Sequence, residues 1–457
     1  MSRLVFHSTN HDTPKVDFKT ALLTGLALDK GLYTPDAYPV LKEEELLAML
    51  DLEYPDLAYN ILSKLIGDQL PVDVLKKITE EAYNFPVPVD KVHDNKYVLR
   101  LDKGPTASFK DFAARAMARM MQYYTKLENR ELLILTATSG DTGGAVASAF
   151  HGMDNIKVAV LFPINEVSDR QRKQMTTLGK NVTAIAIDGK FDDCQALVKR
   201  AFADPDLRGL NFSSANSINV GRLLPQSVYY FWAFLRVNEA KIKEGTYDPV
   251  VISVPSGNFG NLMGGFIAKE LGLPVKKYIA AVNENDEVPS FLKTGEYEKV
   301  VPSRKCLSNA MNVGHPSNLA RIVDLYGGVM DHDGNLPKIP DLKCLRNDLD
   351  GVSVSDDETK NIIAEVHKKY GYVLEPHGAV GWGGLMRYLE NNDTNLPCVT
   401  FETADPAKFP DEIQTILGIN PPMPDSLKEM QQKNEEMAKL KMDYTAFKDF
   451  LAKKYGE

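Results

Sequence analysis

The sequence predicts an α/β protein with two lobes, each built on an open and mostly parallel sheet. Short apolar runs alternate with helix-like runs across residues 132–202, and a second alternation starts at residue 250. Asp248-Pro249 breaks the chain between the two sets. Strands that alternate with helices in this way give parallel sheets whose two faces are both covered. At 457 residues, the chain is long enough for two or three such units.

The domain boundaries follow from where this alternation begins and ends. Before it, the chain has helical segments at 43–52 and 72–84 but no glycine loop and no ligand-like cluster, so we expect a structural accessory lobe. The predicted units are an N-terminal accessory domain at 1–95, a first α/β lobe at 96–245, a second α/β lobe at 246–418 and a C-terminal helical tail at 419–457.

The elements of each lobe are expected in chain order. In the first lobe, we expect strands at 132–138, 157–162 and 182–187 and helices at 145–150, 169–177, 192–202 and 220–242. In the second lobe, we expect strands at 250–254, 277–282 and 398–403 and a helix at 262–271. In the tail, Ser426 and Glu429 fit a capping box, which indicates a surface helix.

Composition argues against several classes of protein. The formal net charge is −9 and no basic stripe is interleaved with aromatic residues, so nucleic-acid binding is not expected. No stretch approaches the ~20 apolar residues of a spanning helix, and the first residues lack the apolar core of a signal peptide. The four cysteines lie far apart, which predicts neither a disulfide framework nor a metal site. A cytoplasmic protein without a membrane partner is expected.

Two glycine loops each join a strand to a helix, at residues 138–144 and 255–261. The N–H groups and the helix dipole at such a junction converge on one spot and favour an anion. Neither loop has the G-x-G-x-x-G pattern of a dinucleotide site or the Lys-Ser/Thr continuation of a Walker loop. A small phosphate or carboxylate held by amides fits better, although either loop could also be a plain connecting turn.

One lysine precedes both loops, in the segment at 104–112 with the sequence GPTASFKDF. Pro105 stiffens the approach to Lys110, and Phe109 and Phe112 give it apolar neighbours. Burial lowers the pKa of a lysine, which makes the amine a nucleophile and a proton carrier, although most lysines are simply exposed. A reactive amine with two anion sites is what pyridoxal 5'-phosphate (PLP) requires: a covalent bond, a cradle for its phosphate and a place for a substrate acid.

These segments resemble, in the same order along the chain, the motifs of threonine synthases of the bacterial and fungal type. That family consists of fold-type II PLP enzymes related to the β chain of tryptophan synthase. The matching segments are 31–33, 85–89, 104–112, 136–143, 192–199, 216–222, 254–261, 307–311, 375–380 and 403–409.

The resemblance implies roles for individual residues. Lys110 would bind PLP covalently, and Thr403 would face the pyridine nitrogen. The cofactor phosphate would lie against Gly257, Asn258, Phe259, Gly260 and Asn261. The substrate carboxylate and the 3′-oxygen of the cofactor would lie near Ser139, Asp141 and Thr142. The substrate phosphate would be bound by Asn216, Ser217 and Arg222, unless this stretch is only a helix-capping turn followed by a surface arginine.

The resemblance also implies a reaction: O-phospho-L-homoserine and water give L-threonine and phosphate by γ-elimination and β-addition. Two positions depart from the family pattern, because Lys103 and Asp405 stand where histidine is usual. Lys103 would be an extra phosphate contact or a solvated flank, and Asp405 would cap the following helix. Alternatively, the two mark a related PLP lyase or dehydratase that acts on another hydroxy or phospho amino acid.

Two further points complete these expectations. His377, in the motif at 375–380, is expected to be structural. A non-catalytic protein that keeps the fold is a third possibility, but Lys110 and both glycine loops are intact, which counts against it. The expected partner is a small phosphorylated amino acid, and the sequence leaves the oligomeric state open.

Overall fold

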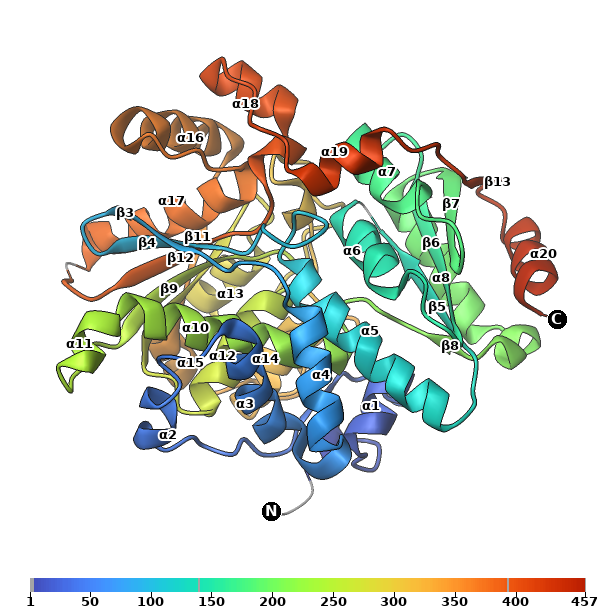
Figure 1. Cartoon of the computed structure of the whole chain (residues 1–457), viewed down its shortest axis with the longest axis horizontal. Helices are drawn as coiled ribbons and strands as arrows, with labels where there is room; N and C mark the ends of the chain where they lie inside the picture. Colours follow the sequence, from blue (N-terminus) through green and yellow to red (C-terminus); the bar gives the residue numbers. More distant parts are fainter. Residues whose placement is uncertain (1–3, 139, 393, 457) are drawn as a thin grey trace.

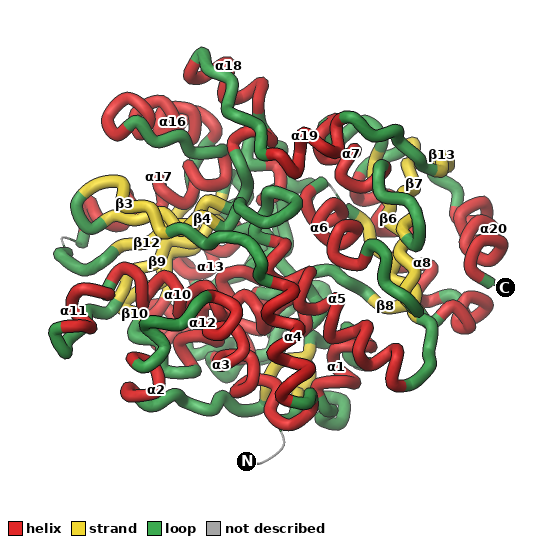
Figure 2. Tube along the Cα trace, viewed as in Figure 1, coloured by secondary structure: helices red, strands yellow, loops and turns green. Residues whose placement is uncertain are grey.

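Two separate groups of strands organise the molecule, as the sequence predicted (Figures 1 and 2). The computed structural model describes residues 4–138, 140–392 and 394–456. The first lobe has a sheet in the order β13-β7-β6-β5-β8, in which all pairs are parallel. Its strands are β5 (Leu132–Ala137), β6 (Ile156–Pro163), β7 (Val182–Asp188), β8 (Phe212–Ser213) and β13 (Ala438–Lys441). Its helices are α6 (Asp141–Phe150), α7 (Asp169–Thr176) and α8 (Phe191–Ala203).

The second lobe has a larger sheet in the order β11-β10-β9-β12-β4-β3, parallel except for the β3–β4 pair. Its strands are β3 (Val89–His93), β4 (Lys96–Arg100), β9 (Val250–Pro255), β10 (Val275–Val282), β11 (Leu349–Ser353) and β12 (Cys398–Glu402). Its helices are α12 (Gly260–Glu270), α13 (Glu287–Thr294), α14 (Leu319–Leu325), α15 (Leu342–Asp348), α16 (Asp356–Tyr370), α17 (Pro376–Asn391) and α18 (Pro410–Leu417). Every residue of β5, β9 and β12 is buried, as expected for strands covered on both faces.

The accessory lobe packs below the two sheets in the view of Figure 1. It contains a two-stranded antiparallel pair and four helices. These elements are β1 (Phe6–Ser8), α1 (Phe18–Thr24), β2 (Tyr33–Pro35), α2 (Glu43–Leu47), α3 (Tyr54–Ile66) and α4 (Val72–Ala82). The Ala-rich helix α5 (Lys110–Leu127) contacts α4 on one side and α6 on the other, so it joins this lobe to the first sheet.

The prediction of one continuous helix at 220–242 is wrong. The segment is instead divided into α9 (Val220–Leu223), a 3₁₀ turn (Leu224–Ser227), α10 (Val228–Val237) and α11 (Glu239–Lys243). Pro225 lies in the turn and has no N–H to donate to the preceding helix. Asn238 separates α10 from α11, and its side-chain amide donates to the carbonyl oxygens of Phe234 and Asp248. Helix α2 is also shorter than the predicted 43–52.

The C-terminal tail is helical, as predicted, but it does more than cover the surface. Its helices are α19 (Asp425–Gln431) and α20 (Tyr444–Tyr455). The predicted capping box is wrong, because Pro424 precedes α19 and Ser426 lies inside the helix. Between the two helices, β13 pairs with β7 and extends the first sheet by a strand that the sequence analysis did not predict. Phe447 and Leu451 of α20 are fully buried in the core of that lobe.

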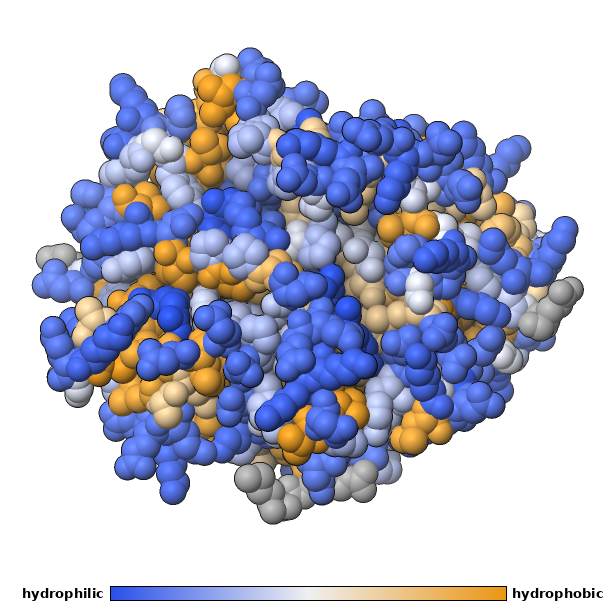
Figure 3. All heavy atoms as spheres, in the orientation of Figure 1, coloured by the Kyte–Doolittle hydropathy of each residue, from blue (hydrophilic) through white to orange (hydrophobic). Residues whose placement is uncertain are grey.

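On the face drawn in Figure 3, hydrophilic residues cover most of the surface and surround several apolar patches, the broadest of them at the lower left. The most exposed large apolar side chains include Leu28, Leu127 and Val301, which lie far apart in the sequence. Single exposed apolar residues of this kind are ordinary for a folded protein. None of the helices within the described ranges is long and apolar enough to cross a membrane.

Candidate active site

Lys110 begins α5 beside the end of β12, because the loop before it pairs with the segment after that strand. Ser108 forms an antiparallel bridge with Ala404. The Phe109 N–H donates to the Thr403 carbonyl oxygen at 2.9 Å, and the Asp405 N–H donates to that of Ala107 at 3.2 Å. The predicted residues Lys110 and Thr403, almost three hundred positions apart, therefore lie side by side.

A buried carboxylate fixes the shape of the lysine loop. Asp111 accepts hydrogen bonds from the Thr106 N–H at 2.8 Å and from the Thr106 hydroxyl at 2.7 Å. Burial raises the pKa of Asp111. A Cβ on Gly104 would lie 2.4 Å from an oxygen of Asp111, so only glycine allows the loop to close this tightly. Ala107 adopts a left-handed φ of 52°, which completes the tight turn.

The amine of Lys110 is in the environment that its apolar neighbours predicted. Burial lowers the pKa of Lys110 to about 8; the nearby Asp141 opposes this shift, whereas Lys408 and Arg222 add to it. The Lys110 Nζ lies 4.8 Å from the centre of the Phe109 ring. A substantial fraction of this amine is therefore neutral near physiological pH, which is the form that attacks an aldehyde.

The first glycine loop is held by charge. Asp141 begins α6 and forms an ion pair with Lys408 at 2.5 Å, in which the two side chains are 3% and 1% exposed. Burial alone would raise the pKa of Asp141, but Lys408 and Lys110 lower it well below its ordinary value. The Lys408 amine also donates to the Thr106 carbonyl oxygen at 3.2 Å. Lys408 thus connects this loop to the lysine loop.

Sequence reasoning missed Lys408, although it lies inside the matching segment at 403–409. A signal was available, because a lysine between Ala407 and Phe409 in a short apolar stretch is expected to be buried and paired. The structure also refines the loop itself, since the Thr138 hydroxyl accepts from the N–H groups of Gly140 and Gly143. Thr142 lies half-buried in the first turn of α6, and Ser139 lies outside the described residues.

The second glycine loop presents amide groups at the start of α12 that have no backbone acceptor in the described part of the chain. The N–H groups of the first helical turn have no acceptor within the helix, and here they belong to Gly260, Asn261 and Leu262. Phe259 precedes the helix with a left-handed φ of 58°. A Cβ on Gly257 would lie 2.9 Å from the backbone of Ala310 and Met311, so glycine is required there. These free donors at a helix N-terminus fit a phosphate group.

Neutral side chains hold this second loop in place. Asn258 bonds through its side-chain amide to the Ser217 hydroxyl, and its side-chain oxygen accepts from the Ser317 N–H at 2.6 Å. Asn261 accepts from the hydroxyl groups of Tyr229 and Tyr230 at 2.7 and 2.8 Å. Its buried Nδ2 donor has no protein partner among the described residues, so it is available to a bound oxygen.

The three residues assigned to the substrate phosphate lie close to these loops. Asn216 accepts from the Thr136 hydroxyl at 2.5 Å, and Ser217 contacts Asn258 as described. Arg222 is 3% exposed, so the alternative that it is a surface arginine is wrong. It donates to the Ala215 carbonyl oxygen at 2.8 Å, while its Nε has no partner among the described residues. Burial lowers the pKa of Arg222 to about 10, so it remains a cation.

A buried carboxylate lies behind Thr403. The Thr403 hydroxyl is 3.4 Å from an oxygen of Glu375, which begins α17 and accepts from the Gly378 N–H at 2.9 Å. The other oxygen of Glu375 lies 2.6 Å from Nδ1 of His377, whose Nε2 accepts from the Ala310 N–H at 3.1 Å. Since Nε2 accepts, the proton is on Nδ1. His377 therefore links Thr403 to the backbone that packs on Gly257, a specific form of the structural role expected for it.

The two positions that depart from the family pattern contact each other. Lys103 lies 3.4 Å from a carboxylate oxygen of Asp405 and 2.8 Å from one of Asp102. Asp405 also caps the following turn, as predicted, by accepting from the Ala407 N–H at 2.9 Å. Burial raises the pKa of Asp405. Lys103 is thus engaged by two carboxylates and is not a merely solvated flank, whereas its contact with the substrate phosphate stays a prediction.

Comparisons with known proteins agree with this geometry. The family model described as pyridoxal-phosphate dependent enzyme matches residues 87–400. Models for the threonine synthase N terminus and C-terminal region match residues 5–83 and 378–451.

Individual relatives match nearly the whole chain. The threonine synthase of Haemophilus influenzae is 40% identical over 98% of this chain and 99% of its own length, and that of Escherichia coli is 42% identical over 91% of each. The structure of the PLP-bound threonine synthase of Brucella melitensis superposes with a TM-score of 0.91 at 34% identity, covering 99% of this chain and 100% of that one. The chain therefore belongs to the threonine synthase family of PLP-dependent enzymes.

Proposed function

We propose that this chain converts O-phospho-L-homoserine and water into L-threonine and phosphate, with PLP bound covalently to Lys110. The observation that carries the proposal is the buried amine of Lys110 beside Asp141 and Arg222, together with the amide donors at the start of α12 that have no acceptor within the helix. The relatives named threonine synthase support this reaction.

The second glycine loop is proposed to hold the cofactor. The free N–H groups of Gly260 and Asn261 and the unpaired Nδ2 of Asn261 donate to the phosphate. Gly257 lets the loop pack closely on the backbone of Ala310 and Met311. Asn258 anchors the loop through its hydrogen bond from the Ser317 N–H, and the left-handed φ of Phe259 turns the chain into α12. On the other side, Thr403 offers a neutral hydroxyl to the pyridine nitrogen, held in place by Glu375.

The substrate is proposed to lie between α6 and Arg222. The amide end of α6 at Thr142, together with Ser139, binds the substrate carboxylate, while Lys408 neutralises Asp141 beside it. The unpaired Nε of Arg222, with Asn216 and Ser217, binds the substrate phosphate. A buried guanidinium is well suited to a phosphate, because charge-assisted hydrogen bonds are stronger away from water.

PLP, when bound, supplies the electron sink for negative charge at the substrate carbons. Lys110 is the group that moves protons among those carbons, since its lowered pKa lets it both take up and release a proton near neutral pH. Arg222 stabilises the phosphate as it leaves. The two lobes, joined by Lys408 and the lysine loop, exclude other water from the site.

The related lyase or dehydratase remains the second candidate. Lys103 and Asp405 are the residues that favour it, because both replace the histidine that is usual in the family. Lys103 contacts both Asp405 and Asp102, so the two substituted positions, Lys103 and Asp405, act together as one ion pair. A change in substrate would have to act through that pair rather than through a free cation.

The test is phosphate release from O-phospho-L-homoserine, measured together with threonine formation. Lys110→Ala is expected to lose at least a thousandfold in rate and to lose the covalent bond, which borohydride reduction and mass spectrometry detect. Lys126→Ala is the matched control, because Lys126 lies on the exposed part of the same helix. Protein with covalently bound PLP that leaves this substrate unchanged would exclude the proposed reaction and favour the second candidate.

A further inference from the structure

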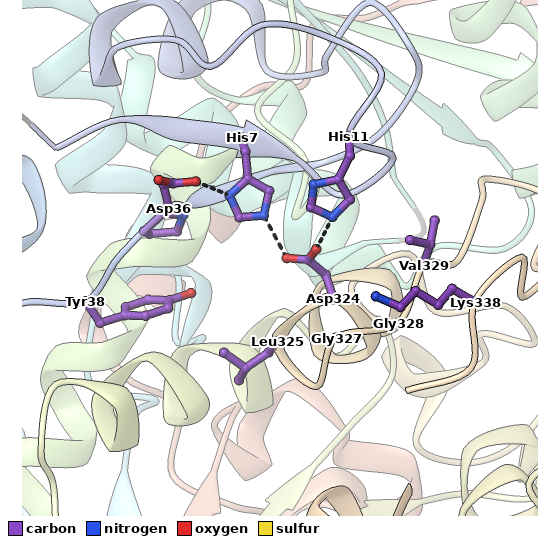
Figure 4. A pocket seen from close by; sticks show the side chains of 11 residues that line it. His7, His11, Asp36, Tyr38, Asp324, Leu325, Gly327, Gly328, Val329 and Lys338 are labelled. Atoms are coloured by element: carbon purple, nitrogen blue, oxygen red, sulfur yellow. Dashed lines mark hydrogen bonds and ion pairs between the residues drawn. The ribbon is translucent and has the colours of Figure 1, made fainter. Parts of the chain in front are cut away.

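A second polar cluster lies outside the active site, at the contact between the accessory lobe and the second lobe. A pocket of about 480 Å³ is lined by His7, His11, Asp36, Tyr38, Asp324 and Lys338, among others. Figure 4 shows both imidazole rings and Asp324 pointing toward one another across this contact. Among the described residues proposed for PLP or substrate, none lines the pocket.

The two histidines and the aspartate converge closely. His7 lies in β1 and His11 in the turn after it, with a left-handed φ of 61° that brings the second ring back over the first. The ring centres are 4.9 Å apart and nearly parallel. Nε2 of His7 is 2.9 Å from one oxygen of Asp324, and Nε2 of His11 is 2.7 Å from the other. One ligand atom from each residue fits within 4.8 Å of the others.

We propose that His7, His11 and Asp324 bind a divalent transition-metal ion of the Zn²⁺ class. Two imidazole nitrogens and one carboxylate are a common ligand set for such ions, with further positions open to water. A tetrahedral ion with bonds of about 2.0 Å holds its ligands about 3.3 Å apart, so each imidazole nitrogen must move a few tenths of an ångström from the Asp324 oxygen that it contacts. His11 has this freedom, because its side chain is 49% exposed.

A fourth residue supports this assignment. Asp36 lies 3.3 Å from Nδ1 of His7, on the opposite side of the ring from Asp324, but the two groups are not aligned as a hydrogen bond, so the carboxylate must turn slightly to accept from Nδ1. Metal-binding histidines typically donate their second nitrogen to a carboxylate, which fixes the tautomer and leaves the other nitrogen free for the ion. Two lysines oppose the binding of a cation here. Lys15 lies 2.6 Å from Asp36, and exposed Lys338 lines the pocket, so both repel a bound Zn²⁺.

The position of the cluster gives the ion a structural consequence. Asp324 lies in α14, and the same segment carries Asn318 and Arg321. Arg321 is fully buried and donates to the carbonyl oxygens of Tyr33 and Ile218, at 2.7 Å each. Asn318 donates to the carbonyl oxygen of Asn258 in the cofactor loop at 2.9 Å. The ion therefore connects the accessory lobe to α14, the helix whose N-cap residue Asn318 contacts the loop before α12.

The experiment is isothermal titration calorimetry: the tag-free holoenzyme is treated with a chelator, the chelator is removed, and Zn²⁺ is titrated to measure stoichiometry and affinity. We expect one Zn²⁺ per chain, with affinity at least tenfold weaker in His11→Gln and in Asp324→Asn. Asp36→Asn is expected to weaken binding by about 10-fold, as is typical when a residue that orients a ligand is removed. Lys338→Met removes a facing cation and is expected to tighten binding.

Two control variants separate this site from other binding. His332→Gln removes an exposed histidine outside the cluster, and Cys344→Ser removes an exposed thiol that is able to bind Zn²⁺ by itself. Both are expected to bind as the parent protein does. The proposal is overturned if His11→Gln and Asp324→Asn bind Zn²⁺ as tightly as the parent, or if no Zn²⁺ binds. As a second readout, Zn²⁺ is expected to raise the Tm of the parent and of His332→Gln but not of His11→Gln.

Discussion

The two glycine loops of the candidate active site are stabilised in opposite ways. The loop at the start of α6 depends on an ion pair, between Asp141 and Lys408, that is almost completely shielded from water. The loop at the start of α12 depends on neutral groups, in which Asn258 and Asn261 bond to hydroxyl, amide and backbone groups. Both loops follow a fully buried strand, so burial alone does not explain the difference.

The difference matches the proposed tasks of the two loops. A buried ion pair is costly to desolvate and contributes little net stability, but it places a definite electric field beside Lys110. A neutral network leaves the amide donors of α12 free for a phosphate and adds no competing charge. The charged loop thus adjusts the pKa of the amine, whereas the neutral loop provides a binding site.

The largest effect is expected from breaking the ion pair on one side. Lys408→Met leaves Asp141 charged and buried without its cation, and such losses typically cost about 3–5 kcal/mol in the free energy of unfolding. Urea denaturation of the cofactor-free protein measures this. Lys408→Met combined with Asp141→Asn is expected to recover most of the loss.

Lys448→Met is the matched control for this prediction, because Lys448 pairs with Asp204 and Asp206 at the surface. That variant is expected to lose far less stability than Lys408→Met, because exposed ion pairs contribute little. Equal losses in the two lysine variants would mean that the buried pair has no special role in holding the first loop.

A smaller effect is expected from the neutral loop. Asn318→Ala removes the donor to the carbonyl oxygens of Asn258 and Ser217 and leaves both without that partner. Unsatisfied buried groups cost about 1–3 kcal/mol, which corresponds to roughly a 5- to 150-fold loss in PLP affinity when the whole cost falls on the bound state. Equilibrium binding of PLP measures it, with Asn347→Ala on the exposed side of α15 as control. An unchanged affinity would show that α14 does not support the cofactor loop.

A third effect concerns pH. Because the pKa of Lys110 is lowered to about 8, the rate of covalent PLP capture by the cofactor-free protein is expected to rise about tenfold per pH unit below 8 and to level off above it. Asp141 raises this pKa, so Asp141→Asn is expected to move the midpoint to lower pH. Stopped-flow absorbance measures the rate, with N-acetyl-lysine as a control amine. A midpoint that does not move would mean that the charge of Asp141 does not affect the pKa of Lys110.

The same contrast explains how much the sequence predicted. Lys110 and both loops were found because strand–glycine–helix junctions have a local pattern, and the two-lobe α/β fold followed from alternating apolar runs. Lys408 and Glu375 were given no role, since their partners Asp141 and Thr403 are distant in sequence and only the folded chain brings them together. Strand β13 was missed for a similar reason, because its AKLK alternation covers only four residues and its partner β7 is distant in sequence.

The smallest effect is expected at the pair that departs from the family pattern. Lys103 is 31% exposed and divided between Asp102 and Asp405, so Lys103→Met is expected to lower stability by no more than about 1 kcal/mol. Since both carboxylates already occupy its amine, KM for O-phospho-L-homoserine is expected to change less than threefold, which corresponds to about 0.7 kcal/mol. Arg222→Met, which removes the buried cation proposed to bind the substrate phosphate, is expected to raise KM far more in the same assay. If Lys103→Met raises KM as much as Arg222→Met does, Lys103 leaves its carboxylates to contact the substrate. The charged groups that act on the substrate would then include Lys103 as well as the Asp141–Lys408 pair of the first loop.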